Sequence, residues 1–473
     1  MTDEVKYKAS RYNHFVENNG KVLAFNAMSC GLGEMDKENY EVYQKIIDGK
    51  ITDYTKIPPD LLEKLKQGNF LVPETRDEIQ KLKAGHFAAR FSNRGFGLTI
   101  IPTLECNFAC DYCYEPSNPD PAKEPKRNFM SQEVQDGLVE MVKSMLPHGT
   151  MLGITWYGGE PLLGLKVIES QTEKFKRVCE DKNAKYTAGI VTNGYLLTPE
   201  VVNRLVELNV SLAQVTVDGP QEIHNKRRPL VGGSPTYEVI MHNLEEIPEN
   251  VNFFVSIRVN IDKRNRDDVI PLLKQLKERG LCDRKNISLY FSQVHTDNYA
   301  CKDIKESCFL TREYTAYELE LYKQAIRIGF KVRNYPMLMI VGCSAITSHS
   351  FVVEPDGTLQ ACWDTVGRKE LSIGKIENSI LKLNDNYCKW LSYSPFEKKE
   401  CLNCSVLPIC LGGCPYRNIY EYRLSSQERN TCMIWKYNLR DKMRFYVEAH
   451  KMGLFVPPKR QQKVEKAETQ EGR

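Results

Sequence analysis

The sequence has no large excess of charge of either sign and no long hydrophobic run. Its 65 Lys and Arg residues against 61 Asp and Glu residues leave a net charge of only +4, which is too small to favour nucleic acid as a partner. No apolar stretch is long enough to cross a bilayer, and no apolar segment follows a basic start. These absences exclude a membrane anchor and a signal peptide, and they predict a cytoplasmic protein.

The size and the cysteine content narrow the class of protein. The 473 residues suffice for two or three domains. A content of 41% hydrophobic and 27% charged residues is typical of a soluble globular protein. Sixteen cysteines are present, and they are densest between Cys343 and Cys432. Because no export signal is seen, these cysteines indicate metal ligation and not a disulfide framework.

Three cysteines, Cys106, Cys110 and Cys113, follow an apolar, strand-like stretch. A four-iron cluster ordinarily takes four thiolates, so a cluster held by three keeps one iron open for a substrate or cofactor. Zinc is the alternative, but zinc sites of this kind usually pair one C-x-x-C with a second pair and are four-coordinate. The triplet therefore favours an open iron–sulfur cluster.

The spacing of the triplet, with Tyr112 before its last cysteine, resembles that of the radical S-adenosylmethionine (SAM) superfamily. The resemblance implies that the three thiolates hold a [4Fe-4S] cluster whose open iron binds the amino and carboxyl groups of SAM. It also implies that an electron from the cluster cleaves SAM to a 5′-deoxyadenosyl radical. An external electron donor of the flavodoxin or ferredoxin type is then expected.

Residues 1–95 form the first predicted unit. Apolar stretches over 12–16 and 22–25, joined by Asn and Gly at 18–20, predict a β-hairpin because Asn and Gly tolerate positive φ. Three short helices follow, and this order resembles the winged-helix recognition element of enzymes that modify ribosomally made peptides. The resemblance implies that the leader of a precursor peptide binds here as an added strand. A packing or dimerisation module is the alternative. The helices are expected to begin near Asp36, Pro59 and Thr75.

Residues 96–336 alternate between strands and helices, which predicts an α/β fold with a parallel sheet or barrel. Six strand–helix units suit the partial (β/α)6 barrel of radical SAM enzymes. Ligands lie at the carboxyl ends of such strands, and the cysteine triplet follows the first of them. The predicted strands cover 97–101, 152–157, 186–192, 212–217, 254–260 and 287–293. Among the helices between them, one is expected to be capped by Ser131 and another to start at Thr198-Pro199.

The segment Gly158-Gly159-Glu160 directly follows the second predicted strand, and two glycines let the backbone approach a ligand closely. The resemblance implies that this segment accepts hydrogen bonds from the SAM amino group; an ordinary strand-to-helix turn is the alternative. The other residues that the resemblance assigns to the SAM pocket are Tyr112 in the cysteine loop, Thr192 and Asn193 for the ribose, Arg258 for the carboxylate, and Gln293 and Val294 for the adenine.

The assignment of Arg258 has an alternative, and so has a further segment near the predicted cavity. Arg258 is a single charge among apolar neighbours, and it could instead face the surface from an edge strand. The stretch from Asp218 to Arg228, with His224 and Arg227 inside it, resembles a segment that forms a wall of the substrate cavity in the family. A structural ion pair explains this stretch equally well.

The C-terminal region contains the second cysteine pattern, C-x2-C-x5-C-x3-C with further cysteines on either side. It resembles the SPASM domain, an iron–sulfur extension of radical SAM enzymes that act on peptides and proteins. The predicted domain covers 337–455, and a disordered tail is expected over 456–473. A zinc ribbon is the alternative. The resemblance implies three [4Fe-4S] clusters in all, with Cys401, Cys404, Cys410 and Cys432 on auxiliary cluster II, and Cys343, Cys362 and Cys414 on auxiliary cluster I.

Auxiliary cluster I lacks a fourth thiolate in this assignment. Cys301 or Cys308 could supply it, or the iron could stay open for a thiolate of the substrate; these alternatives remain open. Asp364, close after Cys362, is the candidate catalytic residue. It could take a proton as the radical intermediate loses an electron, whereas a surface Asp in a turn is the alternative.

The three-part layout resembles maturases of ribosomally made peptides, in particular the thioether-forming sactipeptide and ranthipeptide types. The resemblance implies hydrogen abstraction from a precursor peptide and an intrapeptide bond between a Cys sulfur and carbon, with the sulfur held beside the carbon radical. One alternative is another radical modification, either a C–C or C–O crosslink or the oxidation of a protein side chain as in sulfatase-activating enzymes. The other is a zinc-bearing peptide-binding scaffold without catalysis.

Overall fold

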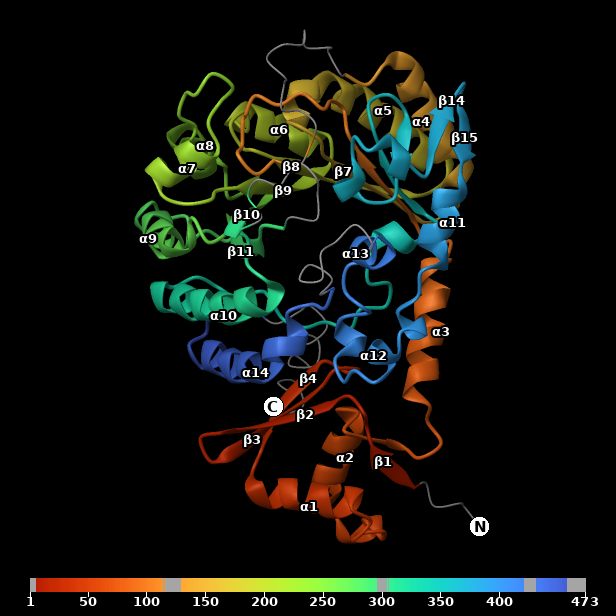
Figure 1. Cartoon of the computed structure of the whole chain (residues 1–473), viewed down its shortest axis with the longest axis vertical. Helices are drawn as coiled ribbons and strands as arrows, with labels where there is room; N and C mark the ends of the chain where they lie inside the picture. The colour runs from red at the N-terminus through yellow and green to blue at the C-terminus, as the bar shows by residue number, and fades with distance from the viewer. Residues whose placement is uncertain are drawn as a thin grey trace.

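A computed structural model of the chain describes residues 6–113, 115, 129–295, 304, 306–420 and 431–456. The predicted disordered tail lies outside these residues except for Val456, and so does Cys301. Within the described ranges, no helix is both long and apolar enough to cross a membrane. A curved sheet with its helices lies at one end of the molecule, and a small N-terminal module lies at the other (Figure 1).

The N-terminal module is built on an antiparallel sheet of β2 (Asn13–Asn18), β3 (Lys21–Asn26) and β4 (Gly31–Met35), with β3 in the middle. Asn19 and Gly20 have φ of 50° and 81° at the turn, so the predicted hairpin is confirmed. The rest of the module comprises β1 (Tyr7–Ala9), which pairs with β5 (Leu71–Pro73), and α1 (Lys37–Ile47), η1 (Tyr54–Lys56), α2 (Pro59–Gln67) and α3 (Glu78–Arg90).

Strand β3 is buried on both faces. Leu23 and Phe25 pack into the main core of the protein. Ala24 points to the other face, because side chains alternate along a strand, and belongs with Tyr43 and Leu65 to a separate small core. The module therefore has a core of its own and still shares one sheet face with the rest of the chain.

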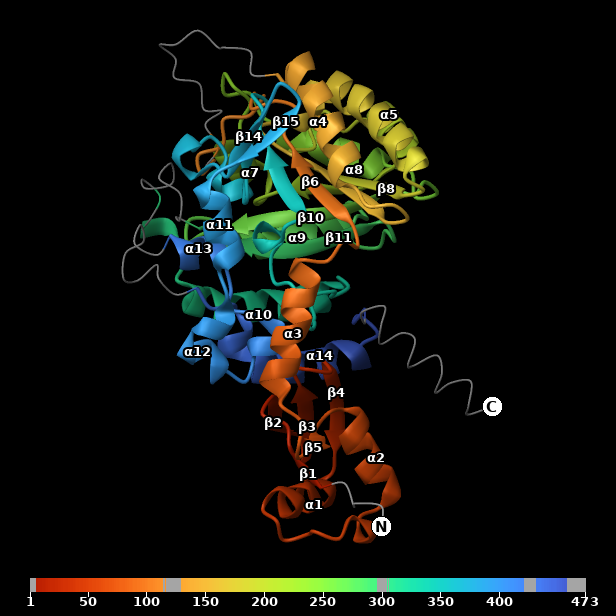
Figure 2. The same cartoon turned by 90° about the vertical axis from the view of Figure 1, so that its right-hand side faces the viewer.

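Helix α3 runs from the module to the barrel (Figure 2). The sequence predicts a start at Thr75, but the helix begins after Asp77, whose carboxylate accepts a hydrogen bond from the backbone N–H of Gln80. A side-chain cap of this kind fixes the first turn. The caps expected at Asp36, Ser131 and Thr198 are present.

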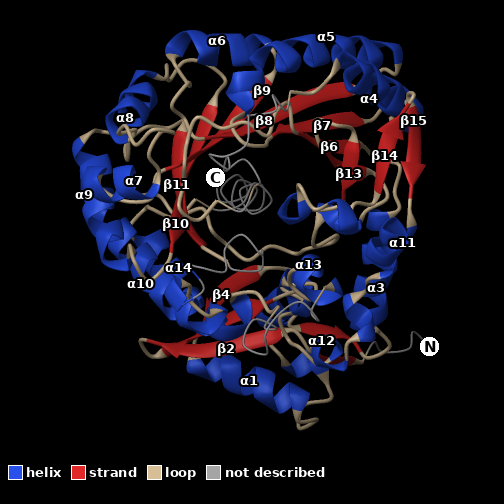
Figure 3. Ribbon diagram, turned by 45° about the horizontal axis from the view of Figure 1, so that its top comes forward, coloured by secondary structure: helices blue, strands red, loops and turns tan. Residues whose placement is uncertain are grey.

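Six parallel strands form the curved wall of the barrel in the order β11-β10-β9-β8-β7-β6, which agrees with the predicted alternation. Helices cover the outside of this wall (Figure 3). The strands are β6 (Phe96–Ile100), β7 (Met151–Trp156), β8 (Lys185–Thr192), β9 (Val210–Thr216), β10 (Phe254–Ile261) and β11 (Ile287–Gln293). The helices are α4 (Gln132–Met145), η2 (Pro161–Gly164), α5 (Leu165–Asp181), α6 (Pro199–Glu207), α7 (Gln221–Arg227), α8 (Tyr237–Glu246), η3 (Arg266–Asp268), α9 (Val269–Glu278) and α10 (Thr311–Ile328).

The sheet does not end with the barrel strands. Strand β12 (Ser350–Val353) pairs in parallel with β6, and β13 (Thr358–Gln360), β14 (Gly374–Glu377) and β15 (Ile380–Leu383) continue the sheet in antiparallel pairs to ten strands. The region predicted as a separate C-terminal domain thus begins as an extension of the barrel sheet. This pairing brings the segments that follow β13 to the cysteine loop after β6.

The remaining C-terminal elements are short until the last helix. They are η5 (Ser344–Ile346), η6 (Trp363–Thr365), η7 (Lys369–Leu371), α11 (Asp385–Ser392), η8 (Pro395–Glu397), α12 (Lys399–Leu402), η9 (Leu407–Ile409) and α13 (Pro415–Ile419), followed by α14 (Trp435–Lys451). Helix α14 packs against α10 and against the β2–β3 hairpin of the N-terminal module.

Candidate active site

A cavity of about 340 Å³ opens at the carboxyl ends of the barrel strands. Parallel strands deliver the loops that follow them to one edge of the sheet, which is where ligands of α/β folds bind. All the residues predicted for the first cluster and the SAM pocket line this cavity except Glu160, and so does Asp364. The lining residues that the sequence predicts are Cys106, Cys110, Cys113, Tyr112, Gly158, Gly159, Thr192, Asn193, Arg258, Gln293, Val294 and Asp364.

The three thiols of the cysteine loop are free and partly buried. Burial raises the pKa of Cys106 and of Cys113 to about 12, and it also raises that of Cys110. Buried thiols become thiolates when they bind a metal ion, because the ion deprotonates a coordinating thiol. Three such groups on one cavity are a donor set of the soft type that iron–sulfur clusters use.

Among the described residues, no group of three or more His, Cys, Asp or Glu side chains could hold a single metal ion. This absence does not conflict with a four-iron cluster, since the thiolates of such a cluster bind different irons at separate corners.

The glycine pair holds the second loop against the cysteine loop. A Cβ on Gly158 would lie 2.5 Å from the carbonyl oxygen of Thr103, and one on Gly159 would overlap the carbonyl oxygen of Glu105. Glycine at these positions lets the backbone N–H of Glu160 donate to Glu105 O at 2.8 Å. The close approach that the sequence predicts is thus made to the cysteine loop itself, while both glycines also line the cavity.

Glu160 does not line the cavity, and its side chain is fully buried. Its carboxylate accepts hydrogen bonds from Thr192 Oγ1 at 2.8 Å, from the backbone N–H of Asn193 at 2.8 Å and from that of Leu162 at 3.0 Å. Burial raises the pKa of this carboxyl, and the three hydrogen bonds oppose the rise. In this structure Glu160 positions Thr192 and Asn193; its direct contact with SAM stays a prediction.

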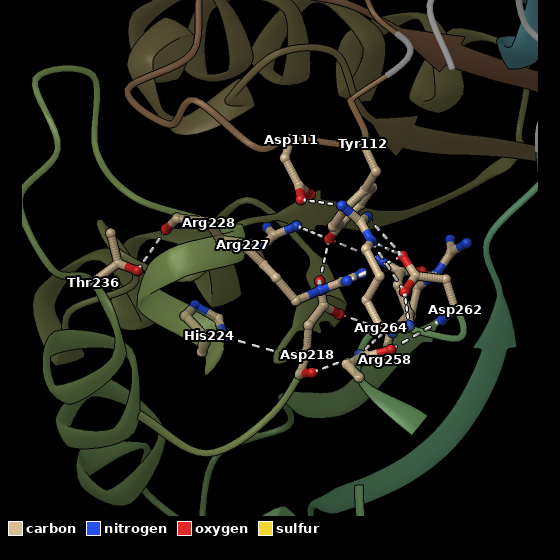
Figure 4. Close-up of polar contacts among 12 residues, drawn as sticks. Asp111, Tyr112, Asp218, His224, Arg227, Arg228, Thr236, Arg258, Asp262 and Arg264 are labelled. Carbon is tan, nitrogen blue, oxygen red and sulfur yellow. Dashed lines mark hydrogen bonds and ion pairs between the residues drawn. The ribbon is translucent and has the colours of Figure 1, made fainter. Parts of the chain in front are cut away.

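Tyr112 is the centre of a polar network behind the cysteine loop (Figure 4). Its hydroxyl donates to the Asp218 carboxylate and accepts from Arg228 at 2.5 Å and from Asn260 Nδ2 at 3.1 Å. The Arg228 guanidinium also lies over the Phe108 ring, 5.6 Å from its centroid. This network ties the cysteine loop to the ends of β9 and β10.

The segment after β9 supplies buried ion pairs (Figure 4). Arg227 pairs with Asp262 at 3.0 Å, and both side chains are almost fully buried. Arg264 joins Asp262 to Asp111 in the cysteine loop, with distances of 2.7 and 2.6 Å. The structural ion pair, which the sequence leaves open, is therefore present at Arg227, whereas Arg228 lines the cavity.

The Arg258 side chain faces the cavity and not the surface. It donates to Asn260 Oδ1 at 2.7 Å and to Ser292 Oγ at 2.9 Å. Sequence reasoning missed Asn260, although a residue two positions after Arg258 on the same strand must share its face. The side-chain amide N–H of Gln293 donates to the carbonyl oxygen of Phe309 at 2.5 Å. This amide group, predicted to contact the adenine, therefore already has a hydrogen-bond partner within the protein.

The turn after β13 contributes Trp363 and Asp364 to the cavity wall. Trp363 stacks on Tyr157, with ring centroids 5.8 Å apart and planes at 29°. The Asp364 carboxylate lies 3.7 Å from the Cys362 sulfur. The assignment of Cys362 to auxiliary cluster I and the role of Asp364 as a base both stay predictions.

The C-terminal cysteines lie in two groups, and their assignment to clusters stays a prediction. Burial raises the pKa of Cys362 well above its usual value, and Asp364, Cys343 and Cys414 nearby raise it further, whereas a hydrogen bond from the backbone N–H of Asp364 opposes the rise. Cys401 and Cys410 both have Cys432 and Cys404 as neighbours. Cys308 follows Ser307, whose carbonyl oxygen accepts from the backbone N–H of Lys263 just after β10, so it lies at the carboxyl edge of the barrel.

Comparison with known proteins agrees with this geometry. Residues 100–276 match the Radical SAM superfamily. Residues 100–276 are thus similar to a radical SAM domain. The matched segment begins at the end of β6 and includes the cysteine loop, the glycine pair and the strands up to β10, so most of the cavity wall belongs to it. Members of this superfamily bind SAM and a [4Fe-4S] cluster.

Two characterised proteins and one solved structure illustrate what the chain is similar to. It is 24% identical over 471 residues to the radical SAM cyclopropyl synthase TigE of Paramaledivibacter caminithermalis, covering 91% of this chain and 94% of TigE. It is 26% identical over 325 residues to the cysteine-type anaerobic sulfatase-maturating enzyme of Clostridium perfringens, covering 65% of this chain and 85% of that enzyme. The solved structure of anSMEcpe with AdoMet has a TM-score of 0.56 at 22% identity, over 75% of this chain and 97% of anSMEcpe, and so shares the fold.

Proposed function

We propose that this chain is a radical SAM enzyme that modifies a ribosomally made precursor peptide and joins a Cys sulfur of that peptide to a carbon in an intrapeptide thioether bond. The observation that carries the proposal is that the three partly buried thiols of Cys106, Cys110 and Cys113 line one cavity, within a segment that matches the Radical SAM superfamily. When bound there, SAM and its cluster supply the radical chemistry that removes a hydrogen atom from an unactivated peptide carbon.

The cavity offers partners for the ribose, the carboxylate and the adenine of SAM. Thr192 and Asn193, held by Glu160, are available to the ribose hydroxyls. The Arg258 guanidinium is available to the carboxylate, and Gln293 with Val294 to the adenine. Tyr112 holds the cysteine loop in place through Asp218 and Arg228, so that the three thiols keep their positions.

Asp364 is the proposed catalytic residue on the substrate side. It lines the cavity and touches the sulfur of Cys362, so it is placed to accept a proton from the reacting part of the peptide. The two C-terminal cysteine sets would hold auxiliary clusters I and II, which makes three [4Fe-4S] clusters with the first. Cluster I has three thiolates from the chain in this assignment, and a substrate thiolate or Cys308 would complete it.

The leader of the precursor peptide is proposed to bind to the N-terminal module. Among the described strands, β4 pairs only with β3, and Glu34 on it is exposed. An open strand edge of this kind can accept an added peptide strand. A solved structure of anSMEcpe holds AdoMet together with the Cp18Cys peptide, which supports a peptide as the substrate class. Electrons would come from an external flavodoxin or ferredoxin.

A second product is favoured by one specific observation. The match to the cyclopropyl synthase TigE extends over 91% of the chain, so it must take in at least part of residues 1–95, whereas the match to the sulfatase-maturating enzyme covers 65%. Carbon–carbon ring closure in the peptide is therefore the alternative to thioether formation.

The test has two parts. Replacing Cys106, Cys110 and Cys113 together by Ala should reduce 5′-deoxyadenosine formation to background, while Cys30→Ala, a buried Cys of the N-terminal module, should leave it unchanged. Deoxyadenosine formation by the triple variant would sink the proposal. The wild-type enzyme is then incubated with a Cys-rich peptide encoded beside its gene. The product is treated with a thiol-alkylating reagent, and its mass is measured by mass spectrometry. A thioether removes two hydrogens and one alkylatable thiol per link, whereas ring closure removes two hydrogens and leaves the thiols.

A further inference from the structure

The N-terminal module touches the loop that contains the cluster II cysteines. Arg11 donates to the carbonyl oxygen of Leu402 at 2.5 Å, and the His14 ring nitrogen lies 3.2 Å from the carbonyl oxygen of Ser405. Leu402 and Ser405 lie on either side of Cys404 in the sequence. The start of strand β2 and the end of helix α12 are accordingly neighbours in the fold (Figure 2). The two residues of each contact are 391 positions apart in the chain.

Tyr12 lies between Arg11 and His14 in the sequence, and its hydroxyl is near the same loop. Its side chain is fully buried, and its hydroxyl has no hydrogen-bond partner among the described residues. Cys404 is one of the charged groups near enough to act on this hydroxyl. Arg11, Glu78 and Asp77 also act on it, but none of them forms a hydrogen bond with it. A buried, unpaired hydroxyl of this kind points to an acceptor that the polypeptide does not provide.

Tyr393 approaches the cysteines from the other side. Its hydroxyl is buried and also lacks a partner among the residues that the structure describes. It lies 2.8 Å from where a Cβ on Gly412 would be, and Gly412 stands between Cys410 and Cys414 in the sequence. The tyrosine backbone is held in place by Arg90, which donates to its carbonyl oxygen at 2.8 Å.

Leaving a buried hydroxyl without a partner costs roughly 1–3 kcal/mol, and native proteins seldom do so. Here two such hydroxyls adjoin one group of cysteines. The sulfurs of an iron–sulfur cluster accept hydrogen bonds, and these bonds are one of the means by which a protein sets the reduction potential of the cluster. Bound sulfur therefore accounts for both unpaired phenols at once.

We propose that Tyr12 and Tyr393 donate O–H···S hydrogen bonds to auxiliary cluster II, so that the N-terminal module forms part of the wall of that centre. The inference rests on the proposed function, in which Cys401, Cys404, Cys410 and Cys432 hold the cluster. Donors to sulfur stabilise the more negative, reduced state and raise the reduction potential. The module that receives the peptide leader is thereby in contact with a redox centre.

The test is a potentiometric titration, followed by electron paramagnetic resonance, of the reconstituted full-length protein. The cluster II signal is assigned as the one lost in Cys410→Ala. Tyr12→Phe and Tyr393→Phe should each shift its reduction equilibrium up to tenfold toward the oxidised state, a fall of up to about 59 mV for a one-electron couple. Tyr446→Phe is the matched control, because Tyr446 is also buried with an unpaired hydroxyl but has Glu318, Tyr322 and Tyr335, and no cysteine, as its charged neighbours.

A second measurement does not depend on how well the variants fold. Electron–nuclear double resonance of wild-type cluster II should show exchangeable protons that disappear in D2O, and the phenylalanine variants should each lack one of them. Unchanged potentials in both variants at wild-type iron content, or the absence of exchangeable protons in the wild type, would overturn the inference. If the inference fails in this way but the wild type still forms deoxyadenosine, the proposed function stands without the tyrosine hydrogen bonds. If the wild type binds no iron, the proposed function itself fails.

Discussion

At the residue scale, the cavity depends on buried polar groups whose partners come from the protein itself. Glu160 accepts three hydrogen bonds and holds Thr192 and Asn193 at the cavity wall. Tyr112 does the same for the cysteine loop through Asp218 and Arg228. None of these groups needs to touch a ligand to matter, because a small displacement of a residue that binds the cofactor is costly for catalysis.

Glu160→Gln tests this positioning role. The amide places an N–H₂ group where one carboxylate oxygen accepts hydrogen bonds, so at least one buried donor loses its partner. We expect the free energy of unfolding to fall by about 1–3 kcal/mol and SAM binding to weaken, as measured by denaturant titration and by calorimetry. Glu140→Gln, at a half-exposed ion pair with Lys143, should cost less than about 1 kcal/mol. Equal effects of the two substitutions would contradict the assignment.

At the scale of elements, helix α3 connects the N-terminal module to the C-terminal region. Its last residue, Arg90, is fully buried and has no carboxylate partner among the described residues. Its guanidinium instead donates to the carbonyl oxygens of Ile346, Leu391 and Tyr393 at 2.8–2.9 Å. One side chain thus fixes the end of α3 to the segments around α11, next to the cluster II cysteines.

Arg90→Met keeps much of the volume but leaves three carbonyl groups without their donor. Hydrogen bonds to charged groups contribute about 1.5–3 kcal/mol each, so we expect a loss of at least about 3 kcal/mol in unfolding free energy. Amide hydrogen exchange should also accelerate over residues 385–397. The matched control is Arg94→Met, at an exposed position just after the helix. Exchange in 385–397 that stays at the wild-type rate would show that Arg90 does not hold this contact.

At the scale of the whole molecule, α14 joins the three parts of the chain. Lys442 on α14 pairs with Glu318 on α10 at 2.7 Å, and both side chains are at most 3% exposed. The Lys442 ammonium also lies 4.5 Å from the centroid of the Trp435 ring. Arg444, two residues after Lys442 on the same helix, donates to the carbonyl oxygen of Glu17 near the tip of the N-terminal hairpin. Barrel, C-terminal region and module therefore meet along one helix.

Removing one partner of the Lys442–Glu318 pair should lower the free energy of unfolding, because the other charge stays buried without its counterion. We expect Lys442→Met to lower the unfolding free energy by about 3–5 kcal/mol. The double variant Lys442→Met with Glu318→Leu should recover most of the loss, since neither charge is then buried alone. A double-mutant cycle from chemical unfolding measures the coupling. Additive losses in the cycle would mean that the two side chains act independently.

The sequence by itself determined the local features and their chemistry. Spacing identified the cysteine triplet, residue types predicted the helix caps at Ser131 and Thr198, and alternation predicted six parallel strands. Since the carboxyl ends of parallel strands meet at one edge, placing Thr192, Arg258 and Gln293 after such strands was enough to bring them to one cavity. These signals are local or repeat along the chain, so they can be recognised without knowing the tertiary packing.

Only the tertiary structure decided what depends on contacts between distant segments. It turned Glu160 away from the cavity toward Thr192, extended the barrel sheet with β12 to β15, and packed residues 11–14 against the loop around Cys404. No residue near Tyr12 in the sequence marks that loop as a neighbour, because these contacts join positions nearly four hundred residues apart. Such contacts arise from the way whole surfaces pack together, and packing leaves no spacing or periodicity in the sequence.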